Sequence, residues 1–492
     1  QKLIDDFSDP NLLQYGSVHL CFAGHVSDSQ MARISKCKEL VSRLKTFKEI
    51  NIHFYFFEDN IFTFNKPEAF YLFNSEKNDI RTTSFLQAIG YNLFTVCSIL
   101  LEKPYIQYQS TSRYAETVAK IVSQNCEDFY SQLRQSEKKD KYKNPRARLI
   151  ILDRSFDLVA PTQHDFAYQT LVYDTKDEAI HLLDATGEDG KLELDETDEI
   201  WMRFKNKHLA ETLVSLSNEI SNFAADNEKT SKIKRGDEVD IEEAMEVIRG
   251  MPKYKELLKK YTLHLQLSQD TMANFTESNW KELISLEQKI ITGVDDAGRE
   301  VSNMDIIRGI TKLSKDLKRE DHTRLLIQYL TCYELAEKDR YNMITSIQND
   351  AFEQILENLP YIYPDIEDGK NLQRRVPKIS DSDFSAYRKK LDESTYDILR
   401  STPKLSQIAI DTFNDNLNSE EFNFMGDAPE EAKKGRREKK VRKADKDISD
   451  ILQNPRIILF VIGGLSHHEI VNLHKIQEEG VVQCQIIAGS TS

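Results

Sequence analysis

Two groups of residues in this 492-residue sequence have side chains that could carry out chemistry. The first is the stretch 153–157, which directly follows the apolar run 149–152 and contains Asp153, Arg154 and Asp157. Carboxylates at the end of a parallel strand lie in the usual ligand crevice of open α/β sheets. As an acid–base or Mg²⁺ site, Asp153 and Asp157 would need a third acid, which the neighbouring sequence does not supply. We favour a structural motif in which Arg154 pairs with one or both aspartates and fixes the end of the strand.

The second group is His467, His468, Glu469 and His474, on a helix predicted over residues 466–479. The pair His467 and His474 is seven positions apart, so both lie on one helix face but about two turns from each other. That separation is too large for one metal ion without ligands from elsewhere. We therefore expect surface or packing histidines, no metal site and no cofactor.

Motifs typical of enzymes are missing from the sequence. It contains no GxxxxGK[ST] phosphate loop, no GxGxxG after a strand, no GxSxG nucleophile turn and no HExxH pair. We assign no catalytic residue and predict a protein that binds partners rather than an enzyme.

Composition limits the kinds of partner and compartment. A formal net charge of −15 disfavours general attraction to nucleic acid or to anionic lipid. The six cysteines are scattered without a CxxC pair, which is typical of reduced thiols in a cytosolic protein. No run approaches the ~20 apolar residues that a membrane-spanning helix needs.

The order of predicted elements indicates an α/β protein with a large, mainly helical insertion. Strand and helix signals alternate over residues 1–160, which predicts mainly parallel, doubly wound sheets. Residues 196–359 carry long helical patterns, including a helical hairpin at about 270–325. A βα pattern returns at 456–488 and predicts a discontinuous domain. Between the helical region and the returning βα pattern, residues 415–448 are predicted to form a disordered linker, with a basic run from Lys433 to Lys446.

Five stretches, in order along the chain, resemble the SM (syntaxin-binding) family, and in particular its exocytic branch. They are residues 149–157 followed by Pro161, His164, Gln169 and 173–174; residues 198–201 with 207–211; residues 251–254 leading to 261–265; residues 293–300; and residues 460–466. The sequence has Ser155 where family members usually have glycine.

This resemblance implies an arch of three domains around a central cleft. Residues 1–49 would be the second half of a first α/β domain. Residues 50–158 and 452–492 would form the second α/β domain, and residues 159–451 the helical third domain.

The resemblance also implies binding sites for SNARE proteins. Met31, Phe47 and Glu49 match a pocket that takes the N-terminal peptide of syntaxin, although ordinary half-buried positions explain these residues equally well. Residues 271–333 match the hairpin that templates SNARE pairing, with a face that includes Leu286, Ile290, Leu313 and Leu317. For each single residue of these four we favour core packing.

Relatives carry a proline in the second helix of that hairpin, and this sequence has Gly309 and Ile310 at about that point. Glycine weakens a helix by about 1 kcal/mol and proline by about 3 kcal/mol. We therefore predict a softer hinge and a hairpin that is more often extended.

The function implied is a monomeric, cytoplasmic SNARE-assembly chaperone for vesicle docking and exocytosis. Its partners would be closed syntaxin, the syntaxin N-terminal peptide, the vesicle SNARE and the assembled SNARE bundle, with no nucleic acid. It would lie peripherally at the plasma membrane through syntaxin. Three alternatives stay open: an SM protein of endosomal, Golgi or lysosomal fusion, an α/β hydrolase or phosphotransferase using Asp153 and Asp157, and a tethering scaffold that uses the basic linker on membranes.

Overall fold

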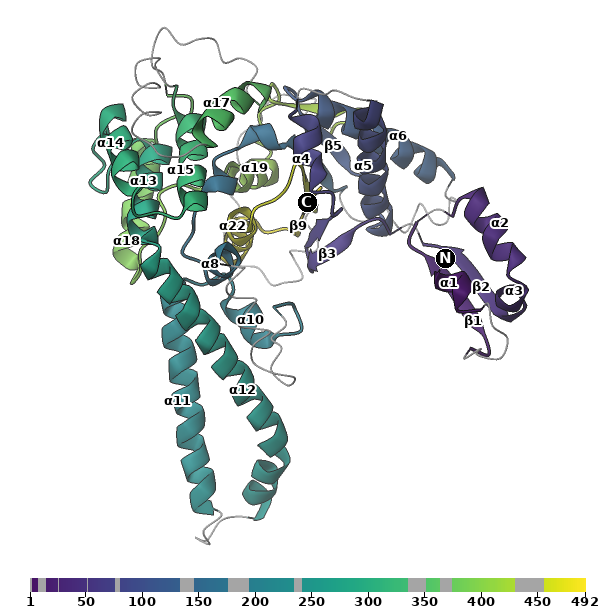
Figure 1. The fold of residues 1–492 in the computed structure, drawn as a ribbon, viewed down its shortest axis with the longest axis horizontal. Coiled ribbons are helices and arrows are strands. Elements are labelled where there is room, and N and C mark those ends of the chain that lie inside the picture. The colour runs from purple at the N-terminus through teal and green to yellow at the C-terminus, as the bar shows by residue number, and fades with distance from the viewer. Residues whose placement is uncertain are drawn as a thin grey trace.

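A seven-stranded sheet organises the centre of the computed structural model (Figure 1). Its strand order is β3-β4-β9-β8-β6-β5-β7. Both edge strands, β3 and β7, run antiparallel to their neighbours, and the other pairs are parallel. The strands are β3 (Tyr55–Glu58), β4 (Ile61–Thr63), β5 (Tyr105–Gln109), β6 (Arg148–Asp153), β7 (Phe422–Met425), β8 (Ile457–Ile462) and β9 (Ile486–Ser490).

The structure describes residues 2–7, 15–24, 26–50, 52–75, 80–132, 146–175, 194–233, 241–334, 351–362, 374–429 and 455–492. The predicted basic run from Lys433 to Lys446 lies outside these residues.

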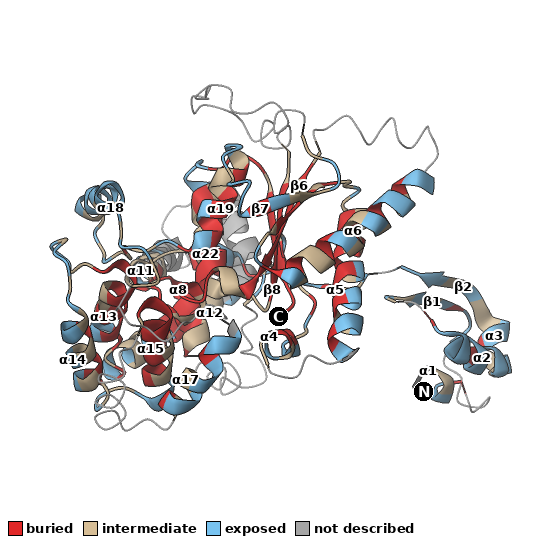
Figure 2. Cartoon of the chain, turned by 90° about the horizontal axis from the view of Figure 1, so that it is seen from above, coloured by how far each residue is buried: buried red, intermediate tan, exposed pale blue. Residues whose placement is uncertain are grey.

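Helices cover both faces of the sheet, as the continuous burial of β6 and β8 requires. Ile458 and Phe460 of β8 pack with α5 (Ile80–Ile99) and α6 (Arg113–Gln132). Leu459 and Val461 pack on the opposite face with α19 (Lys404–Phe413) and α22 (His467–Glu478). Figure 2 shows the buried strands between these two helical layers. The prediction of a doubly wound, mainly parallel sheet is confirmed.

The C-terminal part of the sheet domain begins earlier than the predicted residue 452. Helix α19 belongs to the core on one face of the sheet, and β7 pairs with β5 along residues 422–425. The prediction that all of 415–448 is a linker is therefore wrong for β7. Its four residues were too short a run to detect beside the acidic residues 420–421.

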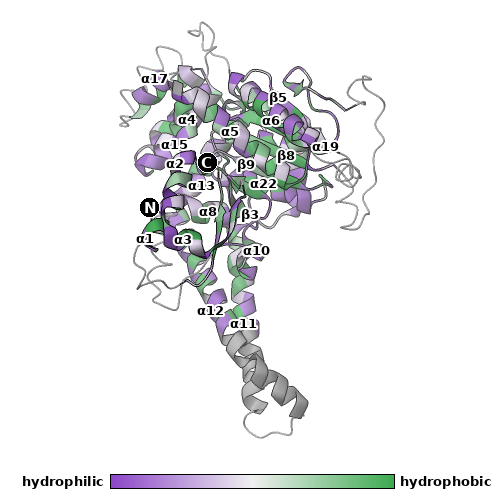
Figure 3. Ribbon diagram, turned by 90° about the vertical axis from the view of Figure 1, so that its right-hand side faces the viewer, coloured by the Kyte–Doolittle hydropathy of each residue, from purple (hydrophilic) through white to green (hydrophobic). Residues whose placement is uncertain are grey.

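The helical part of the chain has a packed body and a projecting pair of helices. The pair is α11 (Leu209–Ile233) and α12 (Ile241–Glu277), which extend together away from the body (Figures 1 and 3). At 1.5 Å per residue, the 37 residues of α12 span about 55 Å. The body contains α8 (Tyr168–Asp174), α10 (Glu199–Phe204), α13 (Trp280–Thr292), α14 (Asn303–Leu313), α15 (Arg319–Cys332), α17 (Ala351–Ile362) and α18 (Asp381–Glu393).

The N-terminal residues form a small separate unit beside the sheet domain (Figures 1 and 2). Its two strands, β1 (Val18–Phe22) and β2 (Leu44–Glu49), are parallel and connected through α2 (Asp28–Lys36) and α3 (Lys38–Arg43), after a short α1 (Lys2–Asp5). Among the described residues of the whole chain, no helix has the length and apolar character needed to cross a membrane.

The close approach of β4 and β9 gives a direct test of the central packing. A Cβ atom on Gly489 would lie 2.2 Å from the ring of Phe62, which itself packs against Phe460. We expect Gly489→Ala to lower the free energy of unfolding by about 1–3 kcal/mol through overpacking. The matched control is Gly16→Ala, where a Cβ meets nothing within 4 Å. Thermal unfolding followed by circular dichroism should separate the two variants, and equal midpoints would contradict the packing described.

Candidate functional site

The end of β6 is tied to α22 by a buried ion pair. The Arg154 guanidinium donates to both carboxylate oxygens of Glu469, at 2.8 and 2.9 Å, and to the carbonyl of Gly464 at 3.1 Å. Both charged side chains are almost completely buried. The prediction that Arg154 pairs with Asp153 or Asp157 was wrong, because the bidentate partner comes from the C-terminal segment. Nothing in the local sequence around residue 154 identifies Glu469.

Asp153 and Asp157 accept hydrogen bonds from backbone N–H groups. Asp153 accepts from Ser155 at 3.0 Å. Asp157 accepts from Val159 and Ala160 through one oxygen, and from Lys404 through the other. Burial raises the pKa of Asp153, although Ser155 and Arg154 oppose that shift. These contacts fix the turn after β6 and hold the start of α19 beside it.

The three histidines of the α22 segment make three separate contacts with other elements. The ring of His467 stacks on Tyr173 with centroids 4.0 Å apart. Nδ1 of His468 lies 2.8 Å from Asp165, and Nε2 of His474 lies 3.2 Å from Glu58. Their side chains therefore join α22 to its neighbours. Across the residues that the structure describes, no group of three or more His, Cys, Asp or Glu is arranged to hold a metal ion.

A buried polar network, absent from our sequence predictions, connects the turn after β6 to the helical body. Nδ1 of His164 lies 2.7 Å from Glu287 of α13, whose other oxygen accepts the His164 backbone N–H. Asp321 and Arg324 of α15 face the other ring nitrogen. Burial alone would lower the pKa of His164, but Glu287 and Asp321 outweigh burial and Arg324 and raise it to about 9. The one sequence signal for this network is His164, which belongs to a stretch that resembles the SM family. Its partners Glu287, Asp321 and Arg324 carry no such signal.

The three residues of the predicted peptide pocket all lie in the N-terminal unit. Phe47 and Glu49 are two positions apart on β2 and therefore share a face. Phe47 is half-buried against Phe22, and a carboxylate oxygen of Glu49 accepts the backbone N–H of Val26 just before α2. Met31 is exposed on α2. A pocket formed by the three stays a prediction.

The predicted SNARE-templating face is largely buried. Leu286, Ile290 and Leu313 belong to the core of the helical body, and Leu317 packs partly buried against it. Core packing, which we favoured for each single residue, is confirmed for Leu286, Ile290 and Leu313, because α13, α14 and α15 pack against each other. An exposed SNARE-templating face that includes these three residues is therefore wrong. The helices that project from the body are α11 and α12 instead (Figure 3). Helical periodicity alone cannot distinguish a core-facing stripe from an exposed one.

The predicted hinge residues lie inside a helix. Gly309 and Ile310 are within the continuous helix α14. A Cβ on Gly309 would lie 2.9 Å from Leu286, so this glycine lets α13 and α14 approach closely. The softer hinge at this point stays a prediction.

Comparison with known families gives a match along the entire chain. The model described as the Sec1 family covers residues 1–492. The chain belongs to the Sec1 family. This membership agrees with the resemblance to SM proteins seen in the sequence, and it places the chain among proteins of SNARE-related vesicle transport.

Relatives and solved structures agree with this assignment. The protein transport protein sec1 of Dictyostelium discoideum is 26% identical, over 100% of this chain and 83% of the relative. The SNARE-interacting protein KEULE of Arabidopsis thaliana is 22% identical, over 97% of this chain and 79% of its own.

Two solved structures share the fold with still lower identity. The crystal structure of the Unc18–syntaxin 1 complex from Monosiga brevicollis matches with a TM-score of 0.70 at 22% identity, over 99% of this chain and 82% of that one. The SM protein Vps45 in complex with the Qa SNARE Tlg2 matches with a TM-score of 0.68 at 18% identity, over 100% and 81%. The expected fold class, an SM-type arch of α/β and helical domains, is confirmed.

Removing one partner of the Arg154–Glu469 pair should strongly destabilise the fold. Arg154→Met leaves a buried carboxylate without its partner, which typically costs about 3–5 kcal/mol. Arg308→Met is the control, since the Arg308–Asp305 pair is more than half exposed and worth at most about 1 kcal/mol. Urea unfolding measures both, and a similar small change in the two variants would refute the structural role.

The raised pKa of His164 predicts that stability falls at alkaline pH. The unfolded chain loses this proton near pH 6.5, whereas the folded chain holds it up to about pH 9. The stabilisation is therefore complete below pH 6.5 and is lost as the pH rises to about 9, with a slope of at most about 1.4 kcal/mol per pH unit. Denaturant unfolding across this range should show the slope in the parent and in His19→Gln, an exposed control. In His164→Gln the slope should be absent, and its persistence there would assign it to another group.

Proposed function

We propose that the chain is a SNARE-assembly chaperone that binds syntaxin and templates SNARE complex formation in vesicle docking and exocytosis. The observation that carries this proposal is the fold shared over nearly the full chain with proteins solved together with syntaxin 1, with the Qa SNARE Tlg2 or with an N-terminal peptide of Sed5p. Besides the Unc18 and Vps45 complexes, this group includes Sly1p with an N-terminal peptide of Sed5p, with a TM-score of 0.67 at 15% identity, over 99% of this chain and 79% of that one. We propose that it acts by differential binding, with no covalent chemistry and no catalytic residue.

The projecting helices α11 and α12 are our candidate for the templating surface. They stand away from the body, whereas the stripe on α13 and α14 is packed in the core. In the described part of α11 an apolar side chain, Val214, is 53% exposed. These two helices pack side by side, and we propose that the helices of the syntaxin and vesicle SNARE partners pack along them. We propose that the chain acts as a monomer. Binding to syntaxin would hold it peripherally at the plasma membrane.

A second candidate is an SM protein of endosomal or Golgi fusion. Vps45 and Sly1p match this chain almost as well as Unc18 does, so the fold supports this branch to a similar degree. The alternative of a hydrolase or phosphotransferase using Asp153 and Asp157 has weaker support, since their oxygens already accept backbone hydrogen bonds.

Calorimetric titration with the cytoplasmic regions of several Qa SNAREs tests the proposal and separates the two branches. We expect saturable one-to-one binding to a plasma-membrane syntaxin and binding at least about tenfold weaker to endosomal and Golgi Qa SNAREs, a difference of about 1.4 kcal/mol. Phe47→Ala should weaken binding to full-length cytoplasmic syntaxin. With a syntaxin that lacks its N-terminal peptide, the parent protein and Phe47→Ala should bind equally well. Tyr71→Ala, an exposed aromatic residue on α4 (Glu68–Phe73), is the matched control and should bind normally.

Two other outcomes would overturn parts of this proposal. Preference for an endosomal or Golgi Qa SNARE would move the chain to the second candidate. Failure to bind any Qa SNARE would reject the chaperone function.

A further inference from the structure

Three consecutive aromatic residues are exposed on β3, an edge strand of the central sheet. Tyr55 is 63% exposed, Phe56 70% and Phe57 38%. Single exposed apolar residues are common on protein surfaces, whereas contiguous ones mark a site of interaction. Tyr55 and Phe56 point to opposite faces of the strand, because successive side chains alternate. Both faces of this edge therefore present an aromatic ring.

The backbone N–H and carbonyl of Phe56 face away from the rest of the sheet. Just before the neighbouring strand β4, the Asn60 carbonyl accepts the N–H of Ala488 in β9 at 2.9 Å. Backbone groups of alternate residues point to the same side of a strand, so those of Phe62 also face β9. Phe62 stands opposite Phe56, and the two form a pair without mutual hydrogen bonds. Among the described residues the Phe56 backbone groups have no partner, so an added strand could bond them.

The usual protection of an edge strand is weak here. Native edges are commonly protected by charged side chains or by proline. The sequence of β3 is Tyr-Phe-Phe-Glu, and its one charged residue, Glu58, is buried. The register of β3 with β4 shifts between Phe56 and Glu58. This irregularity limits an added strand to a short segment that ends near Phe56.

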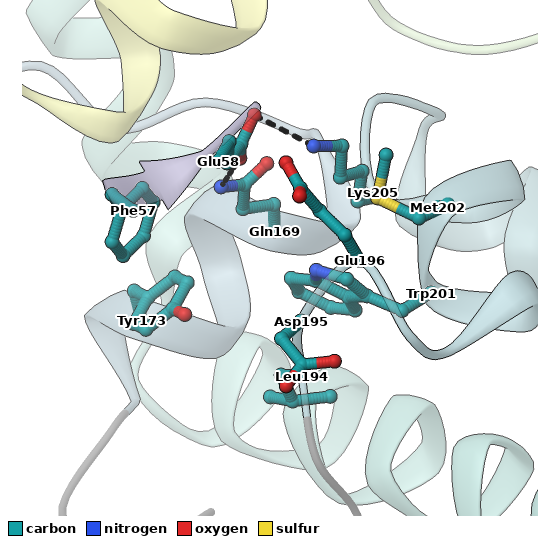
Figure 4. A pocket seen from close by; sticks show the side chains of 10 residues that line it. All are labelled: Phe57, Glu58, Gln169, Tyr173, Leu194, Asp195, Glu196, Trp201, Met202 and Lys205. Carbon is teal, nitrogen blue, oxygen red and sulfur yellow. Dashed lines mark hydrogen bonds and ion pairs between the residues drawn. The ribbon is translucent and has the colours of Figure 1, made fainter. Parts of the chain in front are cut away.

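The C-terminal end of β3 is held in place by the helical part of the chain. Glu58 points inward and binds Lys205 at 2.7 Å and Gln169 at 3.0 Å (Figure 4). The Phe57 ring lies 6.0 Å from the ring of Tyr173. The edge is therefore fixed before a partner arrives, which lowers the entropic cost of binding.

The same end of β3 is negatively charged on its surface. Asp59 is exposed directly after the strand, and a carboxylate oxygen of Glu196 accepts its backbone N–H. Burial and the neighbouring Asp59 carboxyl raise the pKa of Glu196, so the two acids lie close together. The ammonium of Lys205 is already bound to Glu58. Charge complementarity thus favours a partner with a basic residue at this end.

We propose that the outer edge of β3 binds an extended polypeptide segment of a protein partner, which adds to the sheet as a further strand. Its backbone exchanges hydrogen bonds with the N–H and carbonyl of Phe56. Its apolar side chains pack on Tyr55 and Phe56, one on each face, and a lysine or arginine lies beside Asp59. This surface recognises a strand, whereas the proposed SNARE partners bind as helices, so the two proposals can fail independently.

A cyclic β-hairpin peptide is the probe. Its outer strand carries a valine–tyrosine–valine sequence and a terminal lysine, and ring closure holds the strand extended before binding. The control hairpin carries N-methyl groups on the outward amides of that strand, which remove the donors and keep the side chains and the charge. Fluorescence anisotropy of the labelled hairpins, titrated with the full chain, measures both affinities. We expect saturable binding of the first hairpin and binding at least about tenfold weaker for the control.

Matched variants assign the binding to the edge of β3. Phe56→Pro removes an N–H that is not bonded to β4, and an edge strand tolerates proline at such a position. It should weaken binding at least about tenfold. Phe56→Ala keeps the N–H and should weaken binding about threefold through loss of the ring. Tyr71→Ala, on an exposed aromatic residue of α4, should bind normally.

Circular dichroism and thermal unfolding check the fold of each variant. If Phe56→Pro lowers the unfolding midpoint, the N-methylated hairpin still gives the test on the unaltered protein. A hairpin with norleucine in place of lysine should bind about threefold more weakly at low salt, as charge complementarity requires.

Four results would overturn the proposal. No saturable binding of the first hairpin would mean that the edge does not accept a strand. Equal binding of the two hairpins, or equal weakening by Phe56→Pro and Phe56→Ala, would mean that the rings bind apolar side chains without strand addition. A dimer of the chain alone in sedimentation, lost in Phe56→Pro, would assign the edge to a second copy of the chain.

Discussion

The completeness of the central sheet depends on β8, a strand that comes from the far end of the chain. Its residues Ile457–Ile462 are all buried, and it pairs with β6 on one side and β9 on the other. Among the described strands, the hairpin β3–β4 reaches the rest of the sheet only through β9. Without the C-terminal segment, the sheet would therefore be two disconnected pieces with exposed strand edges, which is an unstable arrangement. The helical part must fold as an insertion whose two ends meet at this sheet.

That insertion explains why buried charges gather where the chain leaves and re-enters the sheet. Arg154 follows β6 directly, and its partner Glu469 follows β8 by only a few residues. Asp157 binds the backbone at the start of α19, and His164 binds Glu287 of the helical body. Each contact joins segments far apart in sequence. A buried ion pair contributes little net stability compared with apolar packing, but a mispaired charge is costly, so these pairs favour one arrangement of the segments.

The local sequence predicts the elements better than it predicts their partners. The strand 149–152, the helices α5 and α6, and the capping box of Ser466 and Glu469 were all predictable, because periodicity and caps are local signals. The partner of Arg154 was not predictable, since Glu469 is brought near only by the β6–β8 pairing. For the stripe of Leu286, Ile290 and Leu313 a binding face and core packing both stayed open, with core packing favoured, because a single helix does not reveal whether another helix covers it. The strand β7 was missed because an edge strand of four residues carries almost no pattern of its own.

A further junction between the two parts of the molecule lies at the edge of the sheet. Glu58 belongs to β3, while Gln169 and Lys205 belong to the helical part, and His474 belongs to α22. The Lys205 ammonium lies 2.7 Å from one Glu58 oxygen, and the Gln169 amide donates to the other at 3.0 Å, so two groups of the helical part bind one carboxylate of the sheet. Because Lys205 directly follows α10, these contacts fix the end of α10 against the sheet edge. The helix α11 begins only a few residues later, so the same contacts help to set the position from which the projecting helices extend.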